Sequence, residues 1–275
     1  MDALLQTALQ AADAAARVHM RHFRKIDVED AQEKGKSDFV TRVDREAQEA
    51  ALSVIRKVFP EHHVLAEEEE QPEEASMPGT RRQHGRDWPG EGGYLWIVDP
   101  LDGTTNFLHG HPMFGASVGV GREAVMEAGA VVAPALGDRW WARRGEGAWK
   151  NGRAVRVSKL RDLRKALVGT GFPFKAPELI DRYVRELGRV LRATGGVRRG
   201  GSAALDFCYL SEGILDAFWE EDYLSPWDTA AGQVILAEAG GLVTRLDGSA
   251  VDLEDGSYLA ANSRELLEGL RGLVH

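Results

Sequence analysis

An apolar run that ends in two carboxylates constrains the fold of this chain more than any other stretch. The residues Tyr94-Leu95-Trp96 continue into "IVDPLDGTTNF" (97–107), where Asp99 and Asp102 lie three residues apart. The run 94–98 predicts a buried strand. Removing a carboxylate from water is costly unless a cation or hydrogen-bond donors compensate for it. The fold therefore has to bring compensating groups to the end of this strand.

Strand and helix patterns are interleaved along the chain. Apolar periodicity predicts helices over 2–24, 41–58, 177–193, 203–211 and 226–239, and strands at 63–66, 94–98, 115–121, 126–133, 139–142, 151–158, 214–219 and 242–245. A further strand followed by a loop is predicted in "ALVGTGFPF" (166–174). This order favours an α/β or α+β class. Residues 69–93 have almost no periodic apolar pattern and predict a long exposed loop. We expect one unit over 1–275, with halves of about 1–150 and 151–275.

Composition disfavours several classes of function. The net charge of −9 argues against a nucleic-acid partner. The single cysteine, Cys208, excludes an intrachain disulfide and favours a cytoplasmic protein. The N-terminal stretch lacks the features of a signal peptide, and no segment reaches the roughly 18 apolar residues of a membrane span. We therefore expect a cytoplasmic protein without a membrane partner.

Further carboxylates stand out in three other stretches, and each also has a plain structural explanation. Asp44 follows Thr41, and Asp228 follows Ser225, at the three-residue spacing of a helix capping box. Glu67 and Glu68 begin a run of four glutamates that could be a solvated surface. Both interpretations stay open at each of these positions.

A joint explanation accounts for all of these acids. Clustered carboxylates raise one another's pKa unless a cation lies between them. A set of oxygen ligands suits Mg²⁺, or Mn²⁺, better than Zn²⁺. The residues Gly103, Thr104, Thr105 and Asn106 look like a helix start, whose free backbone N–H groups can hold a phosphate. The pattern indicates a phosphate held for attack by water.

The same motifs resemble those of the inositol monophosphatase family, within the magnesium-dependent, lithium-sensitive sugar phosphatases. "DFVTRVD" is similar to D-x-V-T-x-x-D, and "WIVDPLDGTTNF" matches W-I-[IV]-D-P-[IL]-D-G-T-x-N-F. "PWDTAAGQVILAEAGG" matches W-D-x-A-A-G…E-A-G-G, and "GEGAWKNGRAVRVS", "TGFPF" and "VRRGGSAALDFCYLSEG" are also similar to family stretches. The resemblance covers most of the chain. It implies a layered α-β-α-β-α sandwich and a homodimer.

The resemblance also implies a role for individual residues. Glu67, Asp99 and the carbonyl of Leu101 would hold a water-activating Mg²⁺, and Asp99, Asp102 and Asp228 a second one on the leaving-group side. Thr104 with Asp44 would orient and deprotonate the water, and Glu68 would support a further, weaker metal or its waters. The amides of Gly103 and Thr104, at the helix start that includes Thr105, would take the phosphate. Gly201, Ser202 and Ala203 would contact substrate hydroxyls.

The chain departs from the family pattern in three places. A sugar-contacting glutamate falls on Glu221 in a gapless alignment and on Glu220 with a one-residue insertion. We prefer Glu220 because "DAFWE" then matches the family's D-x-[FY]-[FW]-E run. Ala66 stands where the family usually has glycine, a departure that concerns only the turn there. The loop 69–93 is longer than expected, which leaves metal affinity and lithium response open.

The expected activity is hydrolysis of a small polyol or sugar phosphate, with myo-inositol 1-phosphate as the leading substrate. Alternatives within the superfamily are fructose 1,6-bisphosphate, histidinol phosphate, 3′-phosphoadenosine 5′-phosphate and the 2′-phosphate of NADP. A non-catalytic interaction protein would be expected to lose a metal carboxylate, and none is lost. A nucleotide-binding oxidoreductase would need a dinucleotide fingerprint, which is absent. Cys208 lies in an apolar helix and is expected in the core.

Overall fold

A computed structural model describes residues 2–26, 32–35, 38–40, 42–68, 88–90, 92–174, 176–252 and 256–274. The described chain forms two large sheets and a separate pair of short strands, β1 (Gln32–Gly35) and β2 (Asp38–Val40). Most of the predicted loop 69–93 lies outside the described residues. Thr41 also lies outside them, so its predicted cap is not described.

The first sheet has seven strands in the spatial order β3-β4-β5-β6-β7-β8-β9. Its strands are β3 (His63–Ala66), β4 (Leu95–Asp102), β5 (Gly115–Arg122), β6 (Val125–Ala133), β7 (Asp138–Arg143), β8 (Gly147–Lys150) and β9 (Arg153–Val155). Only β3 and β4 pair in parallel; every other neighbouring pair is antiparallel. All eight residues of β4 are buried, as expected for a strand with helices on both faces of its sheet.

The second sheet has five strands in the spatial order β11-β10-β12-β14-β13. Its strands are β10 (Leu167–Thr170), β11 (Gly196–Arg198), β12 (Ala217–Leu224), β13 (Leu242–Arg245) and β14 (Gly256–Ala261). β10 pairs in parallel with both β11 and β12, whereas β14 pairs antiparallel with β12 and β13.

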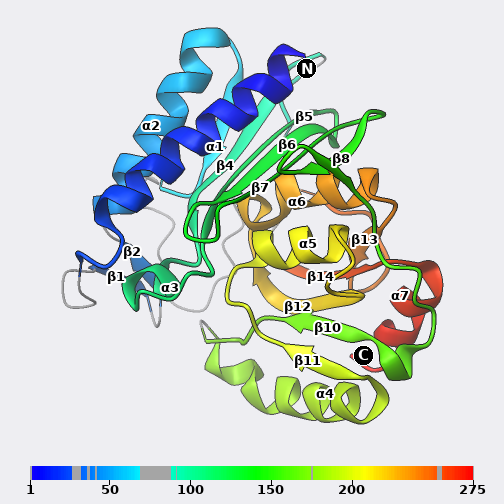
Figure 1. The fold of residues 1–275 in the computed structure, drawn as a ribbon. Helices are drawn as coiled ribbons and strands as arrows, with labels where there is room; N and C mark the ends of the chain where they lie inside the picture. Colours follow the sequence, from blue (N-terminus) through cyan, green and yellow to red (C-terminus); the bar gives the residue numbers. More distant parts are fainter. Residues whose placement is uncertain are drawn as a thin grey trace.

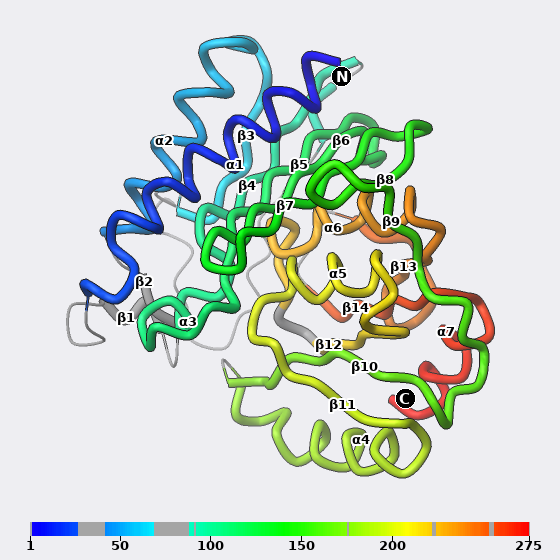
Figure 2. Tube along the Cα trace, viewed as in Figure 1, coloured from blue at the N-terminus to red at the C-terminus, as the bar shows by residue number. Residues whose placement is uncertain are grey.

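Helices separate and cover the two sheets, so that five layers alternate (Figure 1). The α-helices are α1 (Ala3–His22), α2 (Arg42–Val58), α3 (Thr104–Leu108), α4 (Ile180–Ala193), α5 (Ala203–Ser211), α6 (Pro226–Glu238) and α7 (Arg264–Arg271), with 3₁₀ turns η3 (Leu163–Lys165) and η4 (Pro177–Leu179). In the trace of Figure 2, α1 and α2 cover one side of the first sheet and α4 lies at the opposite end of the molecule. The layered α-β-α-β-α prediction is confirmed. In the described part of the chain, no helix has the length and apolar character needed to span a bilayer.

Each boundary between adjacent layers holds its own apolar cluster. Trp96 and Val98 of β4 face α1 and α2, whereas Ile97 between them faces α5 and α6. In β12, Phe218 packs toward α5 and α6, and Trp219 packs toward α4 and α7. Alternate residues of a strand point to opposite faces, so one strand serves two cores.

Glycines in the first sheet let α6 approach it closely. A Cβ atom at Gly129 would lie 2.8 Å from Cα of Ala231 and 2.8 Å from Cγ1 of Val234. A Cβ atom at Gly119 would lie 3.0 Å from Cβ of Ala230. The absence of side chains at these two positions sets the distance between β5, β6 and α6, and with it the position of the first turn of α6.

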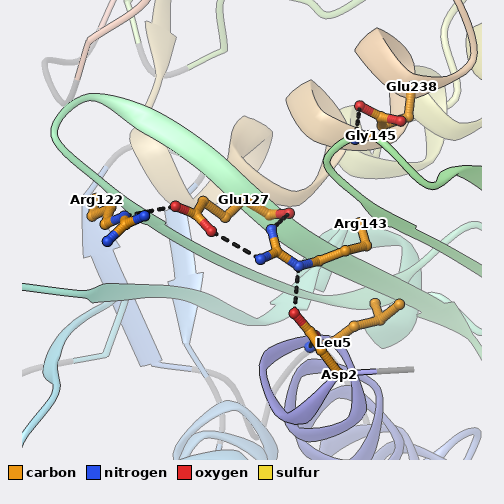
Figure 3. Close-up of polar contacts among 7 residues, drawn as sticks. All are labelled: Asp2, Leu5, Arg122, Glu127, Arg143, Gly145 and Glu238. Atoms are coloured by element: carbon orange, nitrogen blue, oxygen red, sulfur yellow. Dashed lines mark hydrogen bonds and ion pairs between the residues drawn. The ribbon is translucent and has the colours of Figure 1, made fainter.

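A network of charged groups fixes the N-terminal end of α1 against the first sheet (Figure 3). Arg143 of β7 donates from Nε to Oδ2 of Asp2 at 2.5 Å, and Asp2 caps α1 by accepting from the Leu5 N–H at 2.9 Å. Arg143 also contacts Glu127 Oε2 at 3.0 Å, and Glu127 accepts from Arg122 at 2.7 Å. The start of α1 is therefore held by three neighbouring strands.

Most predicted elements are present, but the predictions differ from the structure in both sheets. In the first sheet β8 was not predicted, and the predicted strand 151–158 is shortened to β9. The predicted strand 94–98 extends to Asp102, and the predicted strand 214–219 begins later and ends at Leu224. The strand β14 and the helix α7 were missed in the sequence. The predicted helices 2–24, 41–58, 203–211 and 226–239 are confirmed within two residues.

Candidate active site

Strand β4 contains an irregularity at the acidic motif. Its pairing with β5 is regular up to Asp99 opposite Ser117 and resumes at Asp102 opposite Gly115. Pro100 and Leu101 therefore face a single residue of β5, as in a β-bulge. Proline has no N–H to donate to the sheet, so a bulge is a position that tolerates it. The bulge changes the directions in which the side chains of Asp99 and Asp102 point, compared with a regular strand.

Asp99 is a buried carboxylate among other carboxylates. Asp99 is only 1% exposed, and its Oδ1 accepts the Leu101 N–H at 2.9 Å. Burial raises the pKa of Asp99 well above its ordinary value, and the charges of Glu67, Asp102 and Asp228 raise it further. The hydrogen bond from the Leu101 N–H lowers the pKa of Asp99, but it does not cancel these effects. This carboxylate is electrostatically unfavourable unless a proton or a cation joins it.

Asp102 is held by the N-terminus of α5. Its Oδ2 accepts the hydroxyl of Ser202 at 2.6 Å and the N–H of Ala204 at 2.8 Å. Burial nevertheless raises the pKa of Asp102 to about 6. Ser202 is also the N-cap of α5, since its Oγ accepts the Leu205 N–H at 3.3 Å. Ser202 and Ala204 donate to the same oxygen of Asp102, and the Ala203 N–H adds a further hydrogen bond to this carboxylate.

Asp228 combines the two roles that the sequence left open. Its Oδ2 accepts the backbone N–H of Ser225 at 2.6 Å in a capping box at the start of α6. Asp99, Asp102 and Asp228 each also offer an oxygen within 4.8 Å of the others. Such a set of hard oxygen donors, in which the pKa values of Asp99 and Asp102 are raised, fits Mg²⁺ or Mn²⁺. The residues present therefore fit the metal that the family resemblance implied.

These carboxylates open onto a cavity of about 160 Å³. Most of the residues selected from the sequence line it: Glu67, Asp99, Leu101, Asp102, Gly103, Thr104, Thr105, Gly201, Ser202, Ala203, Glu220 and Asp228. They come from β4, α3, α5, β12 and α6 and from residues next to β3, β4 and α5, so both sheets and the helices α5 and α6 between them contribute. Among the described lining residues there is no histidine or cysteine.

Thr104 links the metal motif to α2. Its hydroxyl lies 3.1 Å from Oδ1 of Asp44 and 3.0 Å from the carbonyl oxygen of Leu101. A hydroxyl has one proton, so it can donate fully to only one of these oxygens. Asp44 is 0% exposed and lies in the first turn of α2. The pair that the sequence selected for handling water is therefore formed.

Gly103 makes the turn between β4 and α3 possible. Its φ is +86°, in the left-handed region, and a Cβ atom there would lie 2.8 Å from the carbonyl oxygen of Met113. Only glycine meets both conditions without strain. Asn106 of α3 donates from Nδ2 to the carbonyl oxygens of Met113 at 2.6 Å and Gly200 at 2.9 Å. The turn is thereby tied to the loop before α5.

The two candidate glutamates of β12 point in different directions. Glu220 lines the cavity and packs against Gly171. Glu221 accepts from Nη2 of Arg182 at 2.7 Å and does not line the cavity. Adjacent strand residues alternate between faces, so only one of the two can reach the site. Glu68 is not among the lining residues either; its backbone N–H donates to Gln48 Oε1 at 2.8 Å.

Other lining residues were not identified from the sequence. Arg199 contributes the single cationic side chain among the described lining residues and lies over the rings of Phe172 and Phe174, with centroid distances of 5.4 and 5.3 Å. Both rings are partly exposed, at 39% and 49%. Asp206, deep in the cavity wall, has a pKa raised well above normal by burial and by the charges of Glu220 and Asp102. In the sequence, only the pattern "TGFPF" and the two arginines before Gly200 indicated that these residues belong to the site.

Cys208 lies in the core, as predicted. It is fully buried in α5, and burial raises the pKa of its thiol well above normal. Because the thiolate is the reactive form of cysteine, this residue is unsuited to act as a nucleophile.

Comparison with known proteins agrees with this geometry. The model of the inositol monophosphatase family matches residues 1–275. The chain is 40% identical over 267 residues to "Nus factor SuhB" of Pseudomonas aeruginosa, covering 96% of this chain and 93% of that protein. Its structure is similar to the extragenic suppressor protein suhB from Bartonella henselae (32% identity, TM-score 0.86, 99% and 98% of the two chains). It is also similar to inositol monophosphatase from Anabaena (33% identity, TM-score 0.77, 98% and 94%).

The family match spans the whole chain. The structure combines the layered fold with the β4 bulge and the carboxylate cluster. The chain therefore belongs to the inositol monophosphatase family.

Proposed function

We propose that this protein is a Mg²⁺-dependent phosphatase that hydrolyses the phosphate monoester of a small polyol or sugar, with myo-inositol 1-phosphate as the leading substrate. One observation carries the proposal. Three carboxylates from β4 and α6 bring their oxygens within 4.8 Å of one another at the wall of a small cavity. Family membership supports a phosphatase, and the donor set supports a hard divalent cation.

Two or three Mg²⁺ ions, or Mn²⁺ in their place, would be held by Glu67, Asp99, Asp102, Asp228 and the carbonyl of Leu101. Such ions supply charge neutralisation for the phosphate oxygens and a lowered pKa for water. The four carboxylates carry the negative charge that makes cation binding favourable. The donors on Asp99 and Asp102, from Leu101, Ser202 and Ala204, fix how these carboxylates are oriented.

Thr104 and Asp44 would orient the attacking water. A cation at the Leu101 carbonyl disfavours donation by the Thr104 hydroxyl to that oxygen, which leaves the hydroxyl proton for Asp44 Oδ1 at 3.1 Å. The lone pairs of Thr104 Oγ1 can then accept a proton of water in a hydrogen bond. Asp44 is buried and cannot exchange its partner for solvent, so the direction of this bond is fixed.

The remaining cavity wall would recognise the polyol. Glu220 offers a carboxylate acceptor for hydroxyl groups, and Arg199 is the cationic donor nearby. The loop Gly201–Ala203 would approach the same hydroxyls.

Phosphate release from a substrate panel tests the proposal. The panel contains myo-inositol 1-phosphate, fructose 1,6-bisphosphate, histidinol phosphate, 3′-phosphoadenosine 5′-phosphate and NADP, each with and without Mg²⁺ and Li⁺. We expect Mg²⁺-dependent release, highest kcat/KM for myo-inositol 1-phosphate, and inhibition by Li⁺. Asp99→Asn should abolish the release, whereas Asp13→Asn, in a surface ion pair with Arg139, should not. Release that persists unchanged in Asp99→Asn would refute the metal assignment.

A second candidate function rests on the names of the relatives. The Pseudomonas aeruginosa protein and a 36% identical Escherichia coli protein are both named Nus factor SuhB. We propose that this chain can also serve as a Nus factor, in transcription. The net charge of −9 predicted no nucleic-acid partner, and the names of these relatives conflict with that expectation. In a transcription assay that depends on this factor, Asp99→Asn should retain activity. Loss of both activities together would count against a separate role.

A further inference from the structure

One buried side chain outside the cavity lining contacts the metal motif from the N-terminal helix. His19, in the last turn of α1, is 0% exposed. Its Nε2 lies 2.7 Å from the carbonyl oxygen of Pro100, 81 residues away. Pro100 lies between Asp99 and Leu101, two of the expected metal ligands. None of the motifs found in the sequence includes His19.

The proton of this histidine can be assigned from chemistry. A carbonyl oxygen only accepts hydrogen bonds, so Nε2 carries the proton and donates it. Burial lowers the pKa of His19 to about 4, so the ring is neutral at physiological pH. Nδ1 is then a bare acceptor, and it has no hydrogen-bond partner among the described residues. The rings of Phe107 and Phe114 lie beside it, at 6.2 and 5.8 Å between centroids.

An unpartnered buried acceptor costs roughly 1–3 kcal/mol. An apolar side chain of similar volume would fill this site between two phenylalanines without that cost. Packing alone therefore does not explain a histidine here. The one favourable polar contact that distinguishes it from an apolar residue is its bond to Pro100.

The β4 bulge explains why Pro100 needs a partner outside the sheet. Pairing with β5 is interrupted between Asp99 and Asp102, so the Pro100 carbonyl stands where the ladder is irregular. His19 supplies its hydrogen bond from α1. The peptide group joining Pro100 to Leu101 is thereby held at both ends: its oxygen accepts from His19, and its N–H donates to Asp99 Oδ1 at 2.9 Å. Rotation of this group would break both bonds and turn the Asp99 carboxylate.

The helix that presents His19 is itself fixed at its other end. Asp2 caps the start of α1 and is bound by Arg143 of β7 (Figure 3). The helix therefore carries His19 at a defined position relative to the first sheet. A donor on a rigid element can hold a flexible bulge in one geometry.

We propose that His19 is a positioning residue for the metal site: its Nε2–H fixes the Pro100–Leu101 peptide group and thereby the orientation of Asp99 and Leu101 toward a divalent cation. This inference rests on the proposed function, because it needs that cation. Hydrogen-bond partners of metal ligands commonly change metal affinity by about 10–100-fold when they are removed. His19 does not bind a metal ligand directly. It acts through the Pro100–Leu101 peptide group, which connects the expected ligands Asp99 and Leu101.

Calorimetric titration with Mg²⁺ alone, without substrate, tests the proposal. His19→Leu removes the donor and keeps an apolar side chain, and we expect its Mg²⁺ dissociation constant to rise by about tenfold. His19→Gln keeps an N–H that can reach Pro100 and should stay within about threefold of the wild type. The matched control is His22→Leu, because His22 lies on the same helix but contacts Glu46 at 3.1 Å and is unrelated to β4. Its dissociation constant should be unchanged.

If His19→Leu does not fold, as judged by circular dichroism, the comparison passes to His19→Gln and His19→Asn. Both are polar, but the shorter asparagine does not reach Pro100, so we expect about tenfold weaker Mg²⁺ binding for asparagine than for glutamine. In phosphatase assays, the defect of a His19 variant should appear as a higher Mg²⁺ requirement with kcat restored at saturating Mg²⁺. Wild-type Mg²⁺ affinity in His19→Leu, or equal affinities of the glutamine and asparagine variants, overturns the inference. Absence of Mg²⁺ binding by the wild-type protein overturns the proposed function and this inference together.

Discussion

The hydroxyl of Ser202 donates a 2.6 Å hydrogen bond to Oδ2 of Asp102, across 100 residues of sequence. This bond joins β4 of the first sheet to the first turn of α5, the helix that lies between the two sheets. The same hydroxyl oxygen caps α5 by accepting the Leu205 N–H. A helix cap thus also orients a candidate metal ligand.

Ser202→Ala should lower both stability and Mg²⁺ affinity. The loss of the cap costs about 0.5–2 kcal/mol of unfolding free energy, and the loss of a donor to a buried carboxylate adds to it. The matched control is Ser263→Ala, because Ser263 caps α7 by accepting the Leu266 N–H and contacts no carboxylate of the cavity. Urea unfolding should show a loss for both variants, while calorimetry should show weaker Mg²⁺ binding for Ser202→Ala only. Equal Mg²⁺ affinity in the two variants would contradict the orienting role.

Glu220→Gln and Glu221→Gln should affect different properties. Glu220 lines the cavity, so its substitution should raise KM for the polyol phosphate by about tenfold, the effect of losing a hydrogen bond to a charged group. Glu221 binds Arg182 on the other face of β12, so its substitution should lower stability and leave KM unchanged. Steady-state kinetics and urea unfolding of both variants check this assignment. A raised KM in Glu221→Gln alone would reverse it.

The shifted carboxylates should lower the stability of the metal-free protein as pH rises, while His19, whose pKa is lowered to about 4, contributes in the opposite direction. The folded-state pKa of Asp102 is about 6 and that of Asp99 is well above normal, so the folded protein binds more protons than the unfolded chain between these values and the ordinary 3.8. The stabilising contribution of Asp99 and Asp102 is complete below their ordinary pKa of 3.8. It is lost as pH rises through their folded-state pKa values. Mg²⁺ competes with the protons, so its stabilising effect should grow with pH.

Thermal unfolding between about pH 5 and pH 8, with and without Mg²⁺, measures this linkage. Asp99→Asn provides the reference because it removes one of the shifted carboxylates, and the metal-free wild type should lose stability relative to this variant as pH rises. The Tm increase caused by Mg²⁺ should be small at the acid end and largest at the alkaline end for the wild type. A Mg²⁺ effect that is largest at acid pH would exclude the carboxylate cluster as its origin.

Gly129→Val should destabilise the protein and displace Asp228. Its side chain would meet Cα of Ala231 and Cγ1 of Val234, which lie 2.8 Å from the position of a Cβ atom, so α6 would have to move away from β6. Overpacking of this kind costs about 1–3 kcal/mol. Gly90→Ala, where a Cβ atom meets nothing within 4 Å, is the control. Urea unfolding should show the loss in Gly129→Val only, together with weaker Mg²⁺ binding. Mg²⁺ binding of wild-type strength in Gly129→Val would show that Asp228 does not depend on this packing.

The sequence predicted much of the site because its motifs are local. Asp99, Pro100 and Asp102 lie on one strand, and the turn at Gly103 follows directly, so their proximity depends on a few backbone dihedrals. The resemblance then supplied Glu67 and Asp228 from elsewhere. The sequence could not distinguish capping from metal binding at Asp228, and the structure shows a geometry in which one carboxylate oxygen caps α6 while the residue joins the cluster.

The choice between Glu220 and Glu221 shows what sequence comparison leaves open. The two alignments differ by one residue, and a shift of one residue in a strand moves a side chain to the opposite face of the sheet. The partner of Glu221 is Arg182 in α4, which no local pattern connects to β12. The strand β14 and the helix α7 were missed for a related reason, since they are held mainly by contacts to the second sheet.

The sequence by itself determined the family, the order of most helices and strands, and the carboxylates of the cluster. Short-range periodicity and a long, specific motif carry that information. Only the tertiary structure decided that Ser202 orients Asp102, that Arg199 faces the cavity between two aromatic rings, and that His19 binds the Pro100 carbonyl. These relationships join residues separated by tens to a hundred positions, and they depend on how layers pack rather than on any local pattern.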